Sequence, residues 1–400
     1  MIDLKAARAD PDTYRAALAR KDAAPEFDAL LAADERWREL IPKVDELRSR
    51  TKLKGKPTPE QLEELQSIKA ELKAAEEELA TAEAERDAAL AVVPNPPHVS
   101  ASDGETEDDA EELRRWGEPA ALESPREHTE IGRFDMERAA RVSGSRFGYV
   151  IGDAARVAMA LYSFALDHLV QAGFTPVIPP VLVREEAMYG TGFFPTERVN
   201  IYALEADGLY LTGTSEVALA SLHMGEILER DELPLRYTGF STNFRREAGA
   251  AGKDTRGMFR VHQFNKVEMF VFTFPEESWD EHERMLDLEE RFLQALGLPY
   301  RVMNVAAGDL GAPAAKKYDL EGWFPFQERY RELTSCSNTT DFQSRRLGIR
   351  YRAESGGLEH PHTLNGTMVT DRALLAILEN FQGGVPDVLA RYGAPAEITA

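Results

Sequence analysis

Apolar and small residues recur every seven positions in two stretches of the first hundred residues, separated by a short run rich in glycine and proline. In the first stretch the heptad rows are Leu30, Trp37 and Val44, with Ala33, Leu40 and Leu47. In the second stretch they are Leu65, Leu72 and Leu79, with Ile68, Ala75 and Ala82. A seven-residue repeat is typical of helices that pack along one another. The pattern therefore predicts an antiparallel helical hairpin over residues 27–92.

The run Gly55-Lys56-Pro57-Thr58-Pro59 predicts the turn of this hairpin, because proline and glycine end helices. Thr58 is a suitable N-cap for the second helix, with Pro59 at its first position and Glu60 in its first turn. Pro42 lies inside the first helix, where it can kink the chain.

A Pro-rich segment, residues 94–97, ends the second helix. Residues 100–129 are acidic and have no regular apolar spacing, so we expect them to form a linker. The chain has 400 residues with 43% apolar content, which is enough for two domains with a substantial core. The predicted organisation is an N-terminal domain of residues 1–99, the linker 100–129, and a larger domain of residues 130–400.

Helical and strand-like stretches alternate in the larger domain. Residues 153–171 have helical spacing and end near Gly173, and a β-branched stretch with prolines, residues 174–180, follows. Proline suits the edge of a sheet or an interface better than a central strand, and the residues alone leave both open. Residues 206–208 predict a hairpin turn, and residues 277–295 predict another helix. An α+β domain built around an antiparallel sheet follows.

Composition limits the classes of function. Cys336 is the single cysteine, which excludes an internal disulfide and a cysteine zinc cluster and fits a reducing compartment. The sequence offers no signal peptide and no run of about 18 uncharged apolar residues. We therefore expect a soluble, cytoplasmic protein without a membrane partner.

The net charge of −22 argues against a nucleic-acid partner, except where basic residues cluster. They cluster at the turn of the hairpin, as Arg48, Arg50, Lys52, Lys54 and Lys56, while the returning helix is rich in glutamate. A hairpin of this kind is often a scaffold or a dimer-forming arm. A positive tip on an acidic rod can instead bind phosphates at one place only.

Charged and aromatic side chains suited to a binding site are concentrated in two segments. They are Phe244-Arg245-Arg246-Glu247 and, after a loop with three glycines, the segment from Arg260 to Glu268. The loop holds Gly249, Gly252 and Gly257, with Lys253 and Arg256. Arginines, an aromatic residue and carboxylates on two joined strands suit the binding of a nucleotide and the activation of a carboxylate. No covalent nucleophile is evident, so the site is expected to work by stabilising charge.

This segment resembles motif 2 of the class II aminoacyl-tRNA synthetases, in the form typical of seryl-tRNA synthetases. Residues 212–216, 330–338 and 341–346 resemble other parts of the same family, and the match runs in order through nearly the whole chain. The resemblance implies a class II catalytic domain with an antiparallel sheet and an N-terminal coiled-coil arm. Residues 153–180 resemble motif 1, which implies a homodimer.

The implied reaction is ATP-dependent activation of L-serine to seryl-adenylate, followed by transfer to tRNA(Ser) and also to tRNA(Sec). Both nucleophiles come from the substrates, so the enzyme supplies positioning and positive charge. By resemblance, the catalytic residues are Arg245, Glu332 and Arg372, and Glu332 with Ser335 would hold Mg²⁺. The family uses its arm to hold the long variable arm of the tRNA, which implies tRNA binding by Arg48, Arg50, Lys52, Lys54 and Lys56.

The resemblance also assigns the substrate contacts. The serine site would comprise Thr214, Ser215, Glu216, Arg245, Glu268 and Thr367. The ATP site would comprise Arg245, Arg246, Glu247, Val261, Phe264, Glu332, Leu333, Thr334, Ser335 and Arg372. Glu247 would accept from the adenine amino group and Phe264 would stack on the base. A site that hydrogen-bonds a hydroxyl rejects alanine, and threonine must be excluded by crowding.

The chain departs from the family in motif 3. Between Asn365 and Arg372 it is one residue shorter than a common form, and Asp371 stands where a small or neutral residue is common. Asp371 could pair with Arg372 and weaken its contact with phosphate. His262, between two other strand residues, is expected to be structural rather than a general base.

Two other functions stay open. One is a paralogue that forms an aminoacyl adenylate and loads a carrier protein, although such proteins generally lack the long arm. The other is a coiled-coil RNA-binding protein with a decayed catalytic domain. The joint presence of Arg245, Glu247, Glu268, Glu332 and Ser335 disfavours decay.

Overall fold

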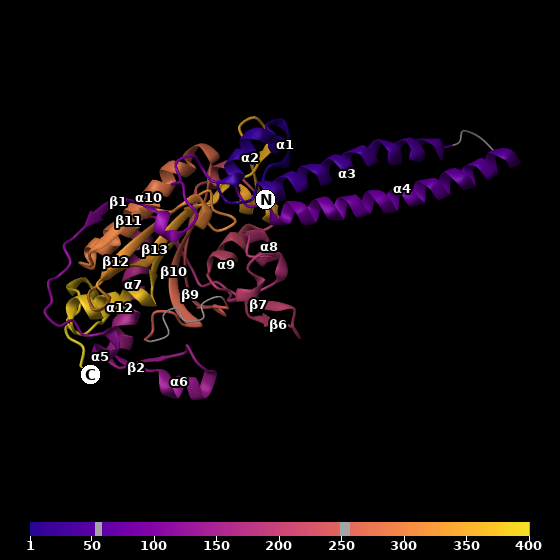
Figure 1. The fold of residues 1–400 in the computed structure, drawn as a ribbon. Coiled ribbons are helices and arrows are strands. Elements are labelled where there is room, and N and C mark those ends of the chain that lie inside the picture. The colour runs from indigo at the N-terminus through magenta and orange to yellow at the C-terminus, as the bar shows by residue number, and fades with distance from the viewer. Residues whose placement is uncertain (53–57, 249–256, 400) are drawn as a thin grey trace. The chain divides into compact units, whose positions relative to one another are not determined.

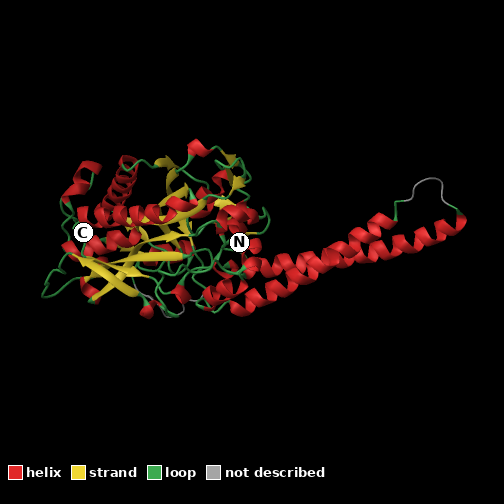
Figure 2. Cartoon of the chain, turned by 90° about the horizontal axis from the view of Figure 1, so that it is seen from above, coloured by secondary structure: helices red, strands yellow, loops and turns green. Residues whose placement is uncertain are grey.

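The computed structural model describes residues 1–52, 58–248 and 257–399. The chain divides into two compact units, Met1–Pro96 and Pro97–Ala400. Among its described residues the first unit has helices as its only regular elements, whereas the second combines helices with a large sheet (Figure 2).

The first unit contains the predicted hairpin. Its helices are α1 (Leu4–Ala9), α2 (Pro11–Ala19), α3 (Ala24–Arg50) and α4 (Pro59–Val92). Helices α3 and α4 run side by side along their length (Figure 1). Their seam buries heptad residues from both helices, including Val44, Leu47, Ile68 and Ala75. The helical arm is therefore confirmed, and Pro42 is accommodated inside α3.

A capping box fixes the start of α4. The Thr58 hydroxyl accepts a hydrogen bond from the Gln61 N–H at 3.3 Å, and the Gln61 side chain accepts from the Thr58 N–H at 2.9 Å. Pro59 occupies the first turn, as the sequence predicts.

The second unit is built on an eight-stranded sheet. Its order is β1 (Glu111–Trp116), β11 (Tyr300–Asn304), β12 (Lys316–Phe324), β13 (Arg329–Asn338), β16 (His362–Thr370), β10 (Gln263–Thr273), β9 (Leu235–Phe244) and β4 (Thr175–Val177). All neighbours are antiparallel except β4 and β9. The predicted antiparallel fold class is confirmed.

The long helices of this unit pack on one face of the sheet and enclose the main core. The longest are α7 (Asp153–Gln171), α10 (Ser278–Ala295) and α12 (Asp371–Phe381). Shorter helices are α5 (His128–Ile131), α6 (Met136–Ser143), α8 (Glu185–Thr191), α9 (Glu216–Ala220) and α11 (Phe342–Leu347). Short strands are β2 (Arg133–Asp135), β3 (Tyr149–Ile151), β5 (Leu182–Val183), β6 (Ala203–Leu204), β7 (Leu209–Leu211), β8 (Ile227–Leu228), β14 (Arg350–Arg352) and β15 (Leu358–Glu359).

The stretch after α7 forms β4 at the edge of the sheet, the position that its prolines favour. Strands β6 and β7 pair across residues 205–208, where the sequence predicts a turn. Helix α10 also matches its predicted range within a residue.

The segment expected to be an irregular linker differs from that expectation. Residues 111–116 form β1, which extends the sheet beyond β11. All six residues are exposed, so β1 has no alternation of apolar and polar side chains. Arg114 contacts Glu290 and the Trp116 ring stacks on Tyr300 at 5.9 Å. An edge strand held by such contacts looks like a linker in the sequence.

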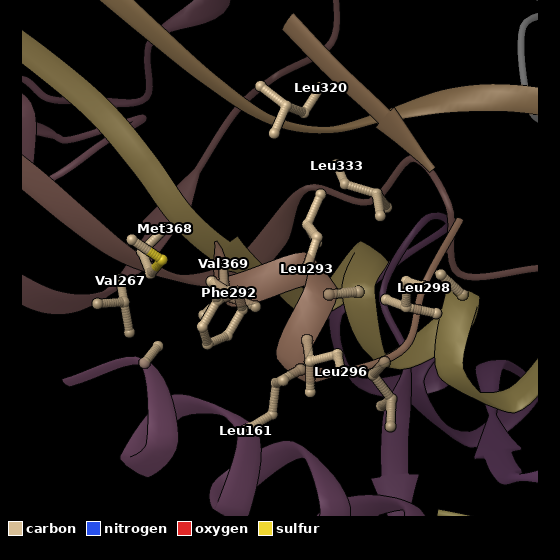
Figure 3. Close-up of a cluster of buried hydrophobic side chains, with 14 of the residues drawn as sticks. Leu161, Val267, Phe292, Leu293, Leu296, Leu298, Leu320, Leu333, Met368 and Val369 are labelled. Carbon is tan, nitrogen blue, oxygen red and sulfur yellow. The ribbon is translucent and has the colours of Figure 1, made fainter. Parts of the chain in front are cut away.

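Two β-bulges decide which side chains reach the open face of the sheet. In β13, Thr334 pairs with Leu320 and Glu332 with Glu321, so Leu333 is the extra residue. In β16, Val369 pairs with Val267 and Thr367 with Glu268, so Met368 is the extra residue. Leu333 and Met368 both turn into the core (Figure 3).

The consequence of the β13 bulge is a change of face. Glu332 and Ser335 are three positions apart and would point to opposite faces of a regular strand. With Leu333 inserted, both line the face opposite α7, α10 and α12. The β16 bulge does the same for Thr367 and Thr370.

Candidate active site

A cavity of about 410 Å³ opens on the face of the sheet away from α7, α10 and α12. Most of the predicted substrate residues line it. They are Thr214, Glu216, Arg245, Glu247, Val261, Phe264, Glu268, Glu332, Leu333, Ser335, Thr367 and Arg372. These residues are spread over more than 150 positions of the sequence, and the central strands β10, β13 and β16 bring them together.

Arg245 follows the end of β9 and projects into the cavity. Its Nε donates to the Gly213 carbonyl at 3.2 Å, and its guanidinium carbon lies 5.2 Å from the centre of the Phe264 ring. Its backbone N–H donates to the His262 carbonyl at 2.9 Å, and the His262 ring Nδ1 donates to the Arg245 carbonyl at 2.9 Å. His262 therefore fixes the backbone of Arg245, which agrees with its structural interpretation.

Glu247 is held beside the exit of the motif 2 loop. It has a positive φ of 52° and pairs with Arg260 at 2.5 Å. The start of the loop is tied to Asn200, whose carbonyl and side chain accept from the N–H groups of Arg246 and Ala248 at 2.9 and 3.2 Å. The predicted phosphate-binding loop residues Gly249, Gly252, Lys253 and Arg256 lie outside the described residues.

Two buried carboxylates form the acidic end of the cavity. Glu216 accepts from the Gln343 side chain at 2.8 Å and from the Asn365 side chain at 3.1 Å. Glu268 is 1% exposed and is paired with Lys266. Burial raises the pKa of Glu216, and burial raises the pKa of Glu268 to about 7 although Lys266 opposes it. A cationic or hydroxyl-bearing ligand would satisfy both groups.

Glu332 and Arg372 pair at 3.2 Å in another part of the cavity. Burial alone would raise the pKa of Glu332, but Lys317, Arg372 and Arg245 outweigh it and hold that pKa below its usual range. Glu332 is thus a carboxylate at neutral pH, and Ser335 lies on the same face. The pair combines oxygen donors that Mg²⁺ prefers.

Asp371 does not take the role that the sequence suggests. Its carboxylate accepts from the Tyr162 hydroxyl and from the Asn265 N–H at 3.0 Å, whereas Arg372 pairs with Glu332. The Asp371–Arg372 pair that the sequence allows does not form, because Asp371 turns toward α7 and β10. Its burial raises its pKa.

Sequence reasoning missed two lysines of this cavity. Lys266 pairs with Glu268 and lies 3.5 Å from the Thr367 hydroxyl. Lys317 pairs with Asp319 at 2.8 Å on β12. Lys266 lies two positions before Glu268, so its place on the same strand face could have been found from the alternation alone.

Some predicted residues do not line the cavity. The Thr334 hydroxyl donates to Glu289 at 2.9 Å, toward α10, because the bulge turns it away from the open face. Ser215 is the N-cap residue of α9 and is buried, and Arg246 lies near the Tyr202 ring.

At the predicted tRNA-binding tip, Arg48 pairs with Glu76 at 3.0 Å and with Asp45, so its charge is already shared. Arg50 is the last residue of α3, and Lys52 lies two positions after it. Lys54 and Lys56 lie outside the described residues.

The antiparallel sheet, with Arg245 after β9, Glu332 in the central strand β13 and Arg372 at the start of α12, matches the core of the class II aminoacyl-tRNA synthetases. The family described as "tRNA synthetase class II core domain (G, H, P, S and T)" matches residues 201–381. A prolyl-tRNA synthetase from Giardia lamblia, in complex with prolyl-adenylate, shares the fold with a TM-score of 0.57 at 17% identity, over 66% of this chain and 53% of that chain.

The chain also resembles one particular member of this class. The family described as "Seryl-tRNA synthetase N-terminal domain" matches residues 1–97. A serine--tRNA ligase from Mycolicibacterium vanbaalenii is 48% identical over 98% of each chain, and one from Thermobifida fusca is 48% identical over 96% of this chain and 94% of its own. The chain belongs to the seryl-tRNA synthetase family.

Solved structures agree with this placement. Seryl-tRNA synthetase from Pyrococcus horikoshii, complexed with ATP, has a TM-score of 0.93 and 39% identity, and covers 100% of this chain and 99% of that chain. The cytoplasmic serine-tRNA ligase from Naegleria fowleri, in complex with AMP, has a TM-score of 0.88 and 36% identity over 98% and 96% of the two chains. Across the described ranges, no helix is long and apolar enough to cross a membrane.

Proposed function

We propose that this chain activates L-serine with ATP and transfers the seryl group to tRNA(Ser). The observation that carries the proposal is one cavity that combines Arg245 and Arg372 with the buried carboxylates Glu216 and Glu268. An amino acid presents a carboxylate and an ammonium group, and the cavity offers partners for both. The serine--tRNA ligase relatives and the nucleotide-bound structures support the choice of substrates.

In the serine site, Glu268 and Glu216 accept from the ammonium group and the hydroxyl, and Thr214 and Thr367 close the pocket. Glu268 and its partner Lys266 both line the cavity, and an incoming cation beside Glu268 replaces part of the solvation that burial removes. Alanine leaves these acceptors without a hydroxyl partner.

In the ATP site, Phe264 stacks on the adenine and Glu247 accepts from its amino group. Arg245 bridges the serine carboxylate and the α-phosphate, because a planar guanidinium can make forked contacts with either oxyanion. Arg372 contacts the phosphates once it leaves Glu332. Of the other predicted ATP contacts, Val261 and Leu333 line the cavity wall.

Glu332 and Ser335 would hold Mg²⁺ together with the nucleotide phosphates. Among the described residues, no group of three His, Cys, Asp or Glu side chains could hold a metal by itself. This agrees with an ion that takes most of its ligands from phosphates and water. When bound, the ion neutralises charge on the phosphates.

The chemistry then follows from position. A serine carboxylate oxygen attacks the α-phosphorus, the bond to the β-phosphate breaks, and pyrophosphate leaves. A hydroxyl of the 3′-terminal ribose of tRNA next attacks the seryl carbonyl, and AMP leaves. Arg245 stabilises the charge that develops on the α-phosphate in the first step.

For tRNA, we propose that the N-terminal unit binds the long variable arm through Arg50, Lys52 and the neighbouring lysines Lys54 and Lys56, with tRNA(Sec) as a second substrate. The acidic α4 would repel RNA elsewhere. We place the enzyme in the cytoplasm, where tRNA is charged for translation.

We also propose a homodimer. Met159 on α7 is 61% exposed and Ile178, just after β4, is 93% exposed. Apolar side chains on the predicted motif 1 elements fit a surface that a second copy covers.

The test is serine-dependent exchange between ATP and pyrophosphate, with alanine and threonine as controls. We expect exchange with serine only. Exchange with serine but no charging of tRNA(Ser) would favour a carrier-protein substrate. A folded protein without exchange would favour the decayed, RNA-binding alternative.

A further inference from the structure

His128 joins two parts of the active site that are far apart in the sequence. It lies in α5 and is 1% exposed, and its Nδ1 contacts Oε1 of Glu379 at 2.7 Å. Glu379 is fully buried in α12, two helical turns after Arg372. On its other side, Nε2 of His128 accepts from the Met258 N–H at 3.4 Å.

The two contacts fix how the ring is protonated. A backbone N–H can only donate, so Nε2 must carry a free lone pair. Nδ1 then carries the proton and donates to the Glu379 carboxylate. The second oxygen of Glu379 is also used, because it accepts from the Phe326 N–H at 3.2 Å.

The chain at the loop exit is shaped around this ring. Gly257 has a φ of +67°, and a Cβ at this position would lie 2.7 Å from Nε2 of His128. Met258 and Phe259 follow and are both buried. The Phe259 ring lies 4.6 Å from the guanidinium carbon of Arg372 and 3.6 Å from that of Arg331.

We propose that His128 is a positioning residue that holds the exit of the motif 2 loop against the motif 3 helix and so assembles the ATP site. The hydrogen bonds from Glu379 through His128 to Met258 position the next residue, Phe259, against Arg372. Phe259 and Arg372 both line the cavity. His128 itself is not among the residues that line this cavity. The inference rests on the proposed function, since it takes ATP as the ligand that binds beside Phe259 and Arg372.

Loss of this connection should affect the ATP end of the cavity more than the serine end. The serine end of the cavity is built from Glu216, Lys266 and Glu268 on other elements, with their own partners. Loosening the loop exit should weaken ATP binding and leave serine binding nearly unchanged. A general loss of stability would weaken both.

The first experiment compares His128→Leu and His128→Gln in the full chain, with calorimetric binding of a non-hydrolysable ATP analogue and Mg²⁺. His128→Leu should weaken binding about tenfold, the scale of one lost buried hydrogen bond. The Gln side chain can place an oxygen near the position of Nε2, so His128→Gln should recover most of the affinity. KM for serine should stay within about twofold in both variants, because its partners are untouched.

His282→Leu is the matched control. His282 is also fully buried, but it bonds the Cys336 carbonyl at 3.0 Å and has no contact with the loop exit. It should lower the melting temperature without a selective loss of ATP affinity.

Glu379→Gln gives a second test if His128→Leu does not fold. An amide has one oxygen for two donors, the Nδ1–H of His128 and the Phe326 N–H, so one contact must fail. ATP affinity should fall although the shape is kept, and ¹⁵N NMR of the His128 ring should show a change of tautomer.

Unchanged ATP affinity in folded His128→Leu and Glu379→Gln, or equal losses of ATP and serine affinity, would overturn the inference. Binding of the ATP analogue is measured without serine or tRNA. A wild-type protein that binds the analogue but activates another amino acid would contradict the proposed function and leave His128 as assigned.

Discussion

Arg245 combines three properties that no other described residue shares. It projects into the cavity, its backbone is tied to His262 on both sides, and its guanidinium lies beside the ring expected to stack on adenine. A side chain so placed is pre-organised for the charge that appears on the α-phosphate.

Replacement of Arg245 by alanine should therefore nearly abolish serine activation, with a loss of about 10³-fold or more in kcat, on the scale of a lost transition-state donor. Pyrophosphate exchange measures this loss. Arg245→Lys is the matched control, since it keeps the charge without the fork and should retain intermediate activity. Full activity of Arg245→Ala would contradict the assigned role.

Glu268 predicts a pH dependence of serine binding. Burial raises its pKa to about 7, so the free enzyme loses the carboxylate as the pH falls through this value. The protonated group no longer attracts the serine ammonium by its charge, so KM for serine should rise between pH 8 and pH 6 while KM for ATP changes less. A flat profile would contradict this role.

The control for this pH dependence is Glu268→Gln. It should bind serine weakly at every pH and lose the slope, because the amide does not titrate in this range. If the slope persists in Glu268→Gln, another group causes it.

At the scale of elements, the sequence predicts the hairpin, the helices α7 and α10 and the motifs on their strands, because these rest on periodicity and local turn chemistry. It does not predict the bulges at Leu333 and Met368, which depend on what the neighbouring strand offers. It also hides β1, whose exposed side chains show no alternation.

Gly322 makes the β13 bulge possible. A Cβ at Gly322 would lie 2.3 Å from Cδ1 of Leu333, the residue that the bulge turns into the core. Gly322→Ala should destabilise the fold by about 1–3 kcal/mol and raise KM for ATP, since the bulge presents Glu332 and Ser335. Thermal unfolding and exchange kinetics measure both effects.

The matched test of the Gly322 prediction is the double variant Gly322→Ala/Leu333→Ala. The smaller side chain at position 333 frees the space that the new Cβ takes. The double variant should therefore lose less stability than the sum of the losses in the two single variants. Simple additivity would mean that the two residues do not compete for that space.

The arm gives a prediction about a whole element. Deletion of residues 36–84 removes most of α3 and α4, which have their own buried seam. Serine activation should persist, because the cavity lies entirely in the second unit, whereas charging of tRNA(Ser) should fall strongly. Equal loss of both activities would contradict the assignment of serine activation to the second unit and tRNA binding to the arm.

At the scale of the whole molecule, the net charge of −22 and the basic hairpin turn determine where the protein binds RNA. An acidic surface repels phosphates over most of its area, so binding is confined to the few basic places. Charging should therefore weaken steeply with salt, by an amount set by the number of phosphates contacted.

The proposed dimer is tested by Ile178→Arg, which puts a charge on a 93% exposed apolar position next to β4. In a dimer this change should shift the species seen by light scattering toward the monomer. Val99→Arg, at an 87% exposed position in another segment, is the matched control and should leave the mass unchanged. A monomeric wild type would contradict the proposal.

The most direct test of the central claim is ATP-dependent charging with labelled serine of a tRNA(Ser) transcript, beside the same transcript with its variable arm cut short. We expect charging of the intact transcript and little of the shortened one, because the N-terminal unit binds the variable arm while the cavity makes seryl-adenylate. No charging of either transcript by folded protein would contradict the account.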